Sequence, residues 1–281
     1  MPSRQTSVSL LIIMMLLFSC QNEHPGASQR GLPVHEKKVE KPAYDTMLRA
    51  LERLQQDPAL RNASIGYLVV DVTTREPVIV AGHNAKQMMV PASTLKIFVT
   101  GAALELIGKP ALREVVITNQ MSVNWRSSKL LRKIGGNVYN TATTAAGTRA
   151  LLDFWSAKGV DTTGMVLYDG NGLSHSNAVS PKQLVEALYA MRTSPYYQLF
   201  YESLPLAGFS GTLHRAMKGT AAEGRLRAKT GTIGRVKSFA GYITTVTGRR
   251  LIFSLIVNDY ECRVKLVKKK MEEVMIRMAE V

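Results

Sequence analysis

The first pattern in this sequence that could perform chemistry is a serine followed three residues later by a lysine, Ser93 and Lys96. Residues 92–107 are expected to form a helix, preceded by Pro91 and ended by Gly108, and residues three apart share one face of a helix. A serine hydroxyl is a poor nucleophile until a base takes its proton. A lysine amine is such a base only if burial or a nearby cation lowers its pKa. The pair therefore predicts a serine nucleophile that is activated by a lysine.

A second pattern, Ser122-Val123-Asn124, places a hydroxyl and an amide close together in the chain. If this segment lies near Lys96, Ser122 can relay a proton to a leaving amine, and Asn124 can orient Lys96 and a substrate amide. The alternative interpretation is a helix cap, because Asn124 directly precedes residues 125–134, which are expected to be helical.

The third pattern is Lys229-Thr230-Gly231-Thr232, at one end of an expected strand. Lys229 and Thr230 can hold a substrate carboxylate by charge-assisted hydrogen bonds, and Lys229 is also the kind of cation that the first pattern needs. Gly231 lets the backbone approach a substrate closely. The backbone amides of Thr232 and Ser93 can together form an oxyanion hole.

Each pattern alone is weak evidence for an active site. Ser93 and Lys96 can equally be a capping serine and a solvated lysine, and Lys229 can be an exposed strand residue. The three patterns in this order, each in a suitable local context, are much more specific. They are the established set of class A β-lactamases and penicillin-binding proteins, which work through a serine acyl-enzyme.

Periodicity and turn residues predict the elements that must position these side chains. Apolar runs and turn signals predict five strands, at 65–72, 77–81, 224–229, 236–245 and 250–257, the last two joined by a hairpin at 246–248. Helical spacing and caps predict helices at 44–56, 92–107, 125–134, 144–158, 181–192 and 264–281. We therefore expect an α+β fold, with an antiparallel sheet built from the N- and C-terminal segments, flanked by helices, and an inserted helical subdomain.

The N-terminus has the pattern of an export signal. Arg4 precedes an apolar run at 8–18 that is too short to span a bilayer, and Ser19-Cys20 follows. The ending resembles a bacterial lipobox, which predicts cleavage before Cys20 and attachment of lipid to it; a plain secretory signal is the alternative. Residues 1–19 are then a signal peptide, residues 20–43 a lipidated flexible tether, and residues 44–281 the enzyme domain.

Composition narrows the class of partner. The chain has 281 residues and a net charge of +15, but it carries no recognisable nucleic-acid-binding motif. Its two cysteines, Cys20 and Cys262, cannot supply a disulfide framework or a zinc site once Cys20 is lipidated. We expect no metal and no organic cofactor.

Longer blocks around these patterns resemble the D-Ala-D-Ala carboxypeptidases of peptidase family S13, the class C low-molecular-weight penicillin-binding proteins. The matching blocks are Pro-Ala-Ser-Thr-Leu-Lys at 91–96, Ser-Val-Asn at 122–124 with the helix after it, Asp-Gly-Asn-Gly-Leu-Ser at 169–174, and Arg-Ala-Lys-Thr-Gly-Thr at 227–232. The resemblance covers roughly residues 60–260. It departs from the family in the short interval of 29 residues (122 − 93) between the first two patterns, where the family carries long extra domains.

The resemblance implies a β-lactamase/transpeptidase-like fold and a serine-type D-Ala-D-Ala carboxypeptidase or endopeptidase. It implies catalytic roles for Ser93, Lys96, Ser122, Asn124 and Lys229. The expected partners are peptidoglycan stem peptides as substrate, β-lactams as covalent inhibitors, and a membrane reached through the N-terminal lipid, but no nucleic acid. The expected location is the cell envelope, in the periplasm.

Two other functions remain open on sequence grounds. A serine β-lactamase shares the three patterns, but no acid between Asn124 and Lys229 stands in a Glu-x-x-x-Asn arrangement, so we expect slow release of penicillin. A non-catalytic peptidoglycan-binding lipoprotein would keep the pocket and lose the chemistry, whereas all five reactive positions are kept here. An α/β-hydrolase is disfavoured because the sequence at 208–211 does not form a Gly-x-Ser-x-Gly elbow.

Overall fold

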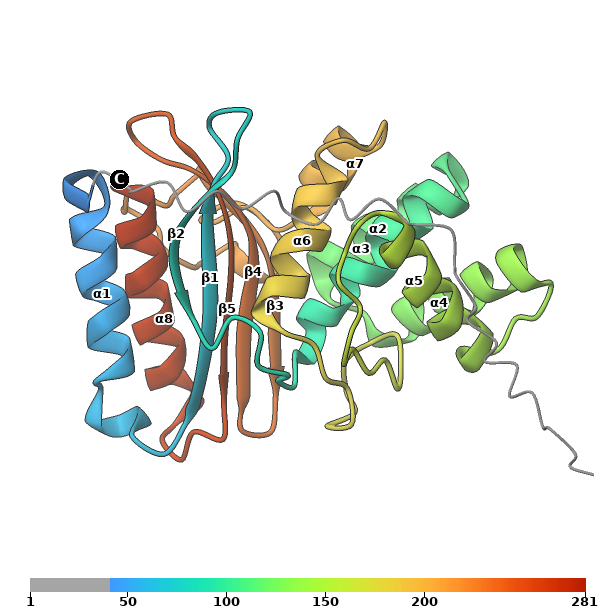
Figure 1. The fold of residues 1–281 in the computed structure, drawn as a ribbon, viewed down its shortest axis with the longest axis horizontal. Helices are drawn as coiled ribbons and strands as arrows, with labels where there is room; N and C mark the ends of the chain where they lie inside the picture. The colour runs from blue at the N-terminus through green and yellow to red at the C-terminus, as the bar shows by residue number, and fades with distance from the viewer. Residues whose placement is uncertain (1–40) are drawn as a thin grey trace, which may run out of the picture.

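A five-stranded antiparallel sheet forms the centre of the computed structural model, which describes residues 41–281 (Figure 1). The strand order is β2-β1-β5-β4-β3, so the two C-terminal strands β5 and β4 lie between the N-terminal hairpin and β3. The strands are β1 (Ser64–Asp71), β2 (Val78–His83), β3 (Leu226–Ile233), β4 (Val236–Thr244) and β5 (Arg250–Asn258). The predicted sheet of N- and C-terminal segments is confirmed.

Helices cover both faces of this sheet and give the domain two apolar cores. On one face, α1 (Asp45–Gln55) and α8 (Val264–Ala279) pack side by side, as Figure 1 shows. On the other face lies the helical subdomain, made of α2 (Lys96–Leu106), α3 (Leu112–Met121), α4 (Asn124–Tyr139), α5 (Thr144–Ala157), α6 (Pro181–Met191) and α7 (Tyr197–Ser203). Because both of their faces are covered, β4 and β5 are buried almost along their whole length.

One predicted boundary is wrong in an informative way. The helix predicted at 125–134 stops just before Gly135, because glycine often ends helices, yet α4 runs through Gly135 to Tyr139 and ends where Asn140 adopts a left-handed φ of 53°. A Cβ on Gly135 would lie 2.6 Å from the backbone nitrogen of Gly147 in α5. Gly135 therefore allows α4 and α5 to pack closely, and glycine is needed here for helix packing and not for a helix cap.

The other differences concern short or shifted elements. The structure contains α3 and α7, which the sequence pattern did not predict, and β3 begins and ends later than the predicted strand at 224–229. None of the helices in residues 41–281 combines the length and apolar character that crossing a bilayer requires. The predicted signal peptide, Cys20 and the tether up to residue 40 lie outside the described residues.

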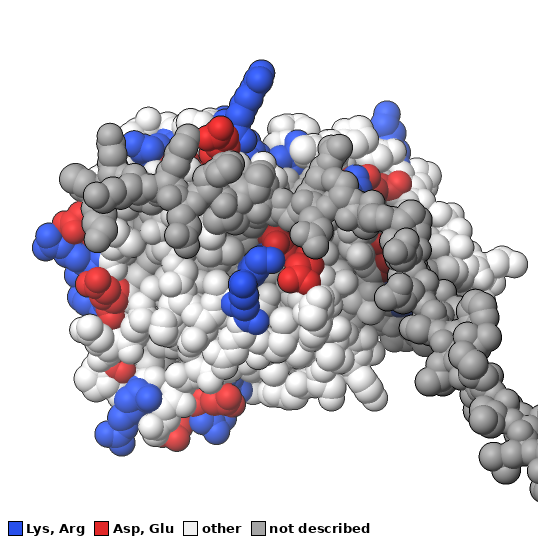
Figure 2. Space-filling view, in the orientation of Figure 1, with Lys and Arg blue, Asp and Glu red and all other residues white. Residues whose placement is uncertain are grey.

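Figure 2 shows basic and acidic side chains interspersed over one face of the described residues. On that face the net positive charge is therefore not gathered into a single patch of the kind that binds a polyanion. The distribution of charge on that face thus gives no support to a nucleic-acid-binding surface.

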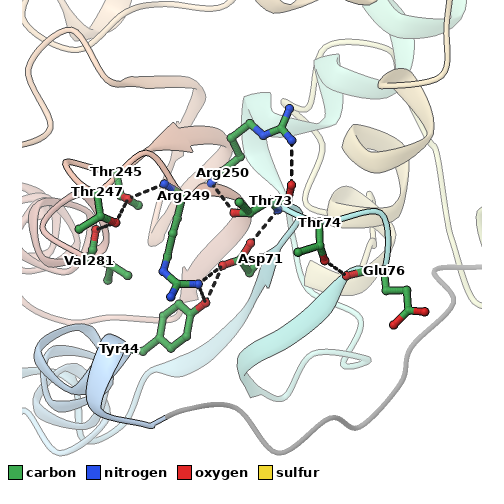
Figure 3. A network of polar contacts seen from close by, with 10 residues as sticks. All are labelled: Tyr44, Asp71, Thr73, Thr74, Glu76, Thr245, Thr247, Arg249, Arg250 and Val281. Carbon is green, nitrogen blue, oxygen red and sulfur yellow. Dashed lines mark hydrogen bonds and ion pairs between the residues drawn. The ribbon is translucent and has the colours of Figure 1, made fainter.

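A buried polar network ties the start of the domain to the sheet (Figure 3). The hydroxyl of Tyr44 donates to Asp71 Oδ2 at 2.5 Å, and the Arg249 guanidinium donates to the same oxygen at 3.3 Å. The backbone amide of Thr73 donates to Asp71 Oδ1 at 2.7 Å. Burial raises the pKa of Asp71, but these hydrogen bonds outweigh burial and hold its pKa below the ordinary value. The ionised carboxylate therefore joins three segments that are distant in sequence.

Replacing Asp71 with alanine is expected to lower the free energy of unfolding by about 2–4 kcal/mol, because the buried Tyr44 hydroxyl loses its acceptor and Arg249 its counter-charge. Urea denaturation at pH 7 measures the loss. Asp45→Asn is the matched control, since Asp45 pairs with Arg49 at the exposed surface and its loss should change stability by less than about 1 kcal/mol. Because its pKa is depressed on folding, the Asp71 contribution should fade as the pH falls through the folded-state pKa. Equal losses in the two variants would contradict the role given to the network.

Candidate active site

Ser93 lies in a short 3₁₀ turn, Ala92–Leu95, that leads directly into α2. The α-helix itself begins at Lys96, so the predicted helix over 92–107 starts with a tighter turn than expected. Ala92 has a left-handed φ of 49°, which is unusual for a residue with a Cβ. The carbonyl of Pro91 is held by the hydroxyls of Thr94 and Ser238, at 2.7 and 2.6 Å. These bonds fix the turn that presents Ser93.

Lys96 is completely buried, and its amine sits among three oxygen atoms. Nζ lies 2.6 Å from Ser93 Oγ and 2.9 Å from Asn124 Oδ1, and it also donates to the backbone carbonyl of Asn171. A neutral amine has two N–H groups and one lone pair. If Asn124 and Asn171 accept the two N–H groups, the lone pair is directed at the hydroxyl of Ser93. The geometry thus suits a lysine that takes the serine proton.

The electrostatic surroundings make that neutral amine accessible near neutral pH. Burial lowers the pKa of Lys96 from 10.5 to about 7, although the negative charge of Asp169 opposes the shift. Lys96 can act as a base near neutral pH only if its pKa is lowered, and burial is the largest cause of the lowered pKa.

The rate of acylation of Ser93 by a β-lactam is expected to rise tenfold per pH unit below about pH 7 and to level off above it. Below that pH Lys96 is an ammonium ion, which has no lone pair to accept the serine proton. The second-order rate constant for a fluorescent penicillin, measured from pH 5 to pH 9, tests this. A rate that does not change across pH 6 to 8 would exclude Lys96 as the titrating base.

Ser122 and Lys229 form the second half of the cluster. Ser122 ends α3 in a left-handed conformation with φ 56°, and its Oγ accepts a hydrogen bond from Lys229 Nζ at 2.9 Å. Lys229 is completely buried, and its other acceptor is the backbone carbonyl of Thr230 at 3.0 Å. Burial, followed by the charges of Lys96 and Lys237, pushes the pKa of Lys229 well below its ordinary value. A carboxylate bound beside Lys229 would supply the counter-charge and raise that pKa.

The helix-cap interpretation of the second pattern does not describe what the side chains contact. The N-cap position of α4 is Val123, which makes no side-chain capping bond, while Asn124 is the first helical residue and bonds Lys96. The interpretation of Lys96 and Lys229 as exposed lysines fails because neither has any exposed surface.

Strand β3 brings the third pattern against the serine turn. A Cβ on Gly231 would lie 2.9 Å from the Ser93 nitrogen and 2.2 Å from Ser238 Oγ, so only glycine permits this contact. The amide of Ala228 points away from β4, since it donates to the carbonyl of Pro205. Amide directions alternate along a strand, so the amide of Thr232 also faces the open edge of β3. That is the position the oxyanion-hole prediction requires.

The threonine hydroxyls of β3 take different partners. Thr230 Oγ1 bonds Thr212 Oγ1 at 3.0 Å, which links β3 to the segment before it. Thr232 Oγ1 accepts from the buried Lys237 at 2.7 Å, and burial lowers the pKa of Lys237 to about 8. The sequence analysis gave no role to Thr212 or Lys237, because only the fold brings them to β3.

A loop at 169–174 completes the cluster. The sequence marks this loop as one of the blocks that resemble the family but does not indicate its role. Asp169 accepts hydrogen bonds from the backbone amides of Asn171, Gly172 and Ser174, at 2.9, 2.6 and 2.9 Å. These bonds hold the Asn171 carbonyl in place for Lys96. The side chain of Asn171 also donates to Ser128 Oγ at 2.9 Å. The run of Asp, Asn and glycines was the available signal, since such residues form tight turns.

Within residues 41–281 there is no group of three His, Cys, Asp or Glu side chains placed to hold a metal ion. The candidate site consists of two lysines, two serines and one asparagine on three segments of the chain, at 93–96, at 122–124 and on β3. The five side chains predicted from sequence form two hydrogen-bonded groups, one of Ser93, Lys96 and Asn124 and one of Ser122 and Lys229. The two groups are close enough for the charge of Lys96 to act on Lys229.

Solved structures with a similar fold come from two groups of proteins. Penicillin binding protein 4 of Haemophilus influenzae superposes with a TM-score of 0.73 at 13% identity, over 82% of this chain and 99% of that one. The TLA-3 extended-spectrum β-lactamase superposes with a TM-score of 0.66 at 16% identity, over 84% and 98%. At these identities the superpositions show the fold alone, and they confirm the expected β-lactamase/transpeptidase-like class.

Curated relatives match about half of this chain. A D-alanyl-D-alanine carboxypeptidase of Actinomadura sp. (strain R39) is 36% identical over 166 residues, which are 57% of this chain and 30% of that protein. D-alanyl-D-alanine carboxypeptidase DacB of Haemophilus influenzae is 28% identical over 142 residues, 50% of this chain and 30% of that protein. The chain therefore matches about a third of the length of these relatives.

The family comparison covers nearly the whole described domain. The D-Ala-D-Ala carboxypeptidase 3 (S13) family matches in two segments, residues 47–113 and 108–280. The two segments meet between Ser93 and Ser122, which is the interval where the sequence lacks the extra domains of the family. The match extends over far more than half of the chain and includes every residue of the buried cluster. The chain belongs to the D-Ala-D-Ala carboxypeptidase 3 (S13) family.

Proposed function

We propose that this chain is a serine-type D-Ala-D-Ala carboxypeptidase or endopeptidase that acts on peptidoglycan stem peptides and is acylated by penicillins. The observation that carries the proposal is the position of Lys96 Nζ, between the hydroxyl of Ser93 and the side-chain oxygen of Asn124. The family and the carboxypeptidase relatives support the same reaction class.

Acylation begins when Lys96 takes the proton of Ser93 and Oγ attacks the carbonyl carbon of the penultimate D-Ala. The carbonyl oxygen becomes an oxyanion, which the amides of Ser93 and Thr232 stabilise. The carbon–nitrogen bond then breaks, and the leaving amine receives a proton through Ser122. The hydroxyl oxygen of Ser122 accepts a hydrogen bond from Lys229 Nζ. The products are an ester of Ser93 and the released amine, which is free D-Ala in the carboxypeptidase reaction and the formerly cross-linked peptide in the endopeptidase reaction.

Deacylation reverses the roles of the same groups. Water attacks the ester carbonyl while a basic group accepts its proton, and the carbon–oxygen bond to Ser93 breaks, which returns the proton to Oγ. The terminal carboxylate of the substrate is assigned to Lys229 and Thr230. This assignment fits the buried Lys229, whose two hydrogen-bond acceptors are both neutral.

A β-lactamase needs a carboxylate that is free to activate the deacylating water. Asp169 is the acid whose charge acts on Lys96, but its two oxygens already accept three backbone amides of the 169–174 loop. Glu186 is buried, and its two oxygens already accept hydrogen bonds from Lys182 Nζ and from the backbone amide of Asp161. This supports slow release of penicillin, so the β-lactamase function is the weaker candidate.

The N-terminal segment belongs to the proposal as well. Residues 1–19 would direct export, and lipid on Cys20 would anchor the domain in the cell envelope, on the periplasmic side of a membrane. Metabolic labelling with a fatty-acid alkyne, compared between the full chain and Cys20→Ser, tests the anchor; equal labelling of the two would contradict it.

The central experiment incubates the purified protein with muropeptides and identifies the products by mass spectrometry. Loss of one alanine from pentapeptides indicates a carboxypeptidase, and splitting of cross-linked dimers indicates an endopeptidase. Ser93→Ala is expected to abolish both, together with labelling by fluorescent penicillin. Wild-type protein that is labelled by penicillin yet changes no muropeptide would favour a binding protein, and rapid turnover of a chromogenic cephalosporin would favour a β-lactamase.

A further inference from the structure

A surface pocket lies away from the serine cluster, and none of its lining residues belongs to that cluster. Its volume is about 320 Å³, and it lies between the end of the sheet, the end of α6 and α7 (Figure 1 shows α7 beyond the upper end of α6). Its lining is drawn from the ends of β1, β4 and β5, from the end of α6 and from α7: Val72, Arg192, Tyr197, Gln198, Tyr201, Tyr242, Ile243, Thr244, Arg250 and Leu251. Tyr242 stands four residues beyond Ser238 on β4, about 13 Å along the strand from the serine turn.

Three tyrosine rings form one wall of this pocket. Tyr197, Tyr201 and Tyr242 contact one another with centroid separations of 5.5 to 5.8 Å. The hydroxyl of Tyr242 is used internally, since it donates to the carbonyl of Leu188. The Arg227 guanidinium lies over the Tyr201 ring, 5.2 Å from its centroid, but is not among the residues that line the pocket. The rings meet at interplanar angles of 41° to 79°, and Tyr242 is buried whereas Tyr197 and Tyr201 are partly exposed. The wall is therefore a packed aromatic cluster, and its two partly exposed rings can pack against the face of a ring-shaped ligand.

Two guanidinium groups flank the tyrosines without a carboxylate partner among the described residues. Arg192 donates to the carbonyl of Val72 at 3.2 Å, and Arg250 donates to the carbonyl of Thr73 at 2.9 Å. Figure 3 shows the Arg250 side chain directed away from the Asp71–Arg249 pair, so the acid of that network does not neutralise it. Each guanidinium has five N–H donors, and one backbone bond leaves most of them available.

The charge of the pocket is one-sided. No Asp or Glu is among its lining residues; Glu202 lies close by and accepts a hydrogen bond from Gln198 Nε2 at 2.6 Å. Burial raises the pKa of Tyr197, while the charges of Arg192 and Arg250 oppose that rise, which places both cations near its hydroxyl. Arginine is the side chain that best matches carboxylate and phosphate oxygens, because its donors form a planar fork.

We propose that this pocket is a second ligand site, which binds an acidic sugar by stacking its ring on the tyrosines and pairing its anionic group with Arg192 and Arg250. Carboxylated and phosphorylated sugars share this chemistry. The site is independent of the proposed peptidase reaction, because none of its lining residues belongs to the serine cluster.

Isothermal titration calorimetry of the full chain with four probes tests the proposal. The probes are N-acetylmuramic acid, N-acetylglucosamine 1-phosphate, neutral N-acetylglucosamine and inorganic phosphate. We expect one or both acidic sugars to bind with a dissociation constant near the millimolar range, and the two acidic probes distinguish a carboxylated from a phosphorylated ligand. Equal binding of the neutral sugar would overturn the role of the arginines, and equal binding of inorganic phosphate would overturn the role of the tyrosines.

Variants locate the binding on this pocket. Arg250→Gln is expected to weaken the acidic sugar at least tenfold, and Tyr201→Leu to weaken it severalfold. Arg263→Gln removes an exposed guanidinium at the start of α8, outside the pocket, and should leave the affinity unchanged. Ser93→Ala should also bind normally. Absence of binding by the wild-type protein, or undiminished binding by a folded Arg192→Gln/Arg250→Gln variant, would refute the site.

Discussion

Replacing Lys96 with methionine is expected to slow acylation of Ser93 by penicillin about 10³-fold, while the protein stays folded. General-base assistance contributes roughly 10²- to 10⁴-fold to such reactions, and Lys96 Nζ is the basic group that contacts Ser93 Oγ. Methionine nearly preserves the volume of the buried side chain and removes an amine that is costly to bury. Stopped-flow fluorescence with a labelled penicillin gives the rate, and circular dichroism reports the fold.

Two further variants separate the lost base from the lost charge. Lys96→Arg keeps a cation but cannot release its proton at neutral pH, so we expect it to be as slow as the methionine variant. Lys129→Met removes an exposed lysine from α4 and should acylate at the wild-type rate. An arginine variant with near-normal activity, or a methionine variant within tenfold of wild type, would show that Lys96 is not the base.

Gly172→Ala is expected to reduce acylation more than 100-fold, although the residue carries no functional group. Gly172 has φ 81°, and a Cβ there would lie 2.0 Å from the carbonyl oxygen of Ala92 and 3.1 Å from the Ser93 nitrogen. Both neighbours are backbone atoms that cannot rotate away. The loop must therefore retreat from the serine turn, which removes the Asn171 carbonyl from Lys96 and shifts the Ser93 amide that we propose for the oxyanion hole.

Gly248→Ala is the matched control, because Gly248 has a similar φ of 84° with no atom within 4 Å of an added Cβ. It carries the left-handed strain alone, which costs about 1–2 kcal/mol, without the collision. We expect it to acylate normally with that modest loss in urea denaturation, whereas Gly172→Ala loses activity beyond any such loss. Equal acylation rates in the two variants would show that the loop does not hold the site.

The sequence by itself determined that Ser93 and Lys96 lie together, as the proposed reactive pair requires. Ser93 and Lys96 are three residues apart on a short turn and helix, so their contact is local and follows from spacing. The sheet also followed from sequence, because apolar runs with turn signals mark β1, β4 and β5 whatever their partners are. By contrast, the sequence does not distinguish a glycine that ends a helix from one, such as Gly135, that lets one helix pack closely on another.

The tertiary structure decided what surrounds those residues. The pKa of Lys96 near 7 comes from complete burial, and burial depends on segments far away in the chain. The Asn171 carbonyl is a backbone atom, which every residue possesses, so no side-chain pattern could assign it to Lys96. The tyrosine and arginine pocket likewise joins the ends of three strands with α6 and α7. Local contacts can be predicted from the spacing of residues in the sequence. Burial and long-range contacts exist only after the chain has folded, because they depend on which distant segments exclude water from one another.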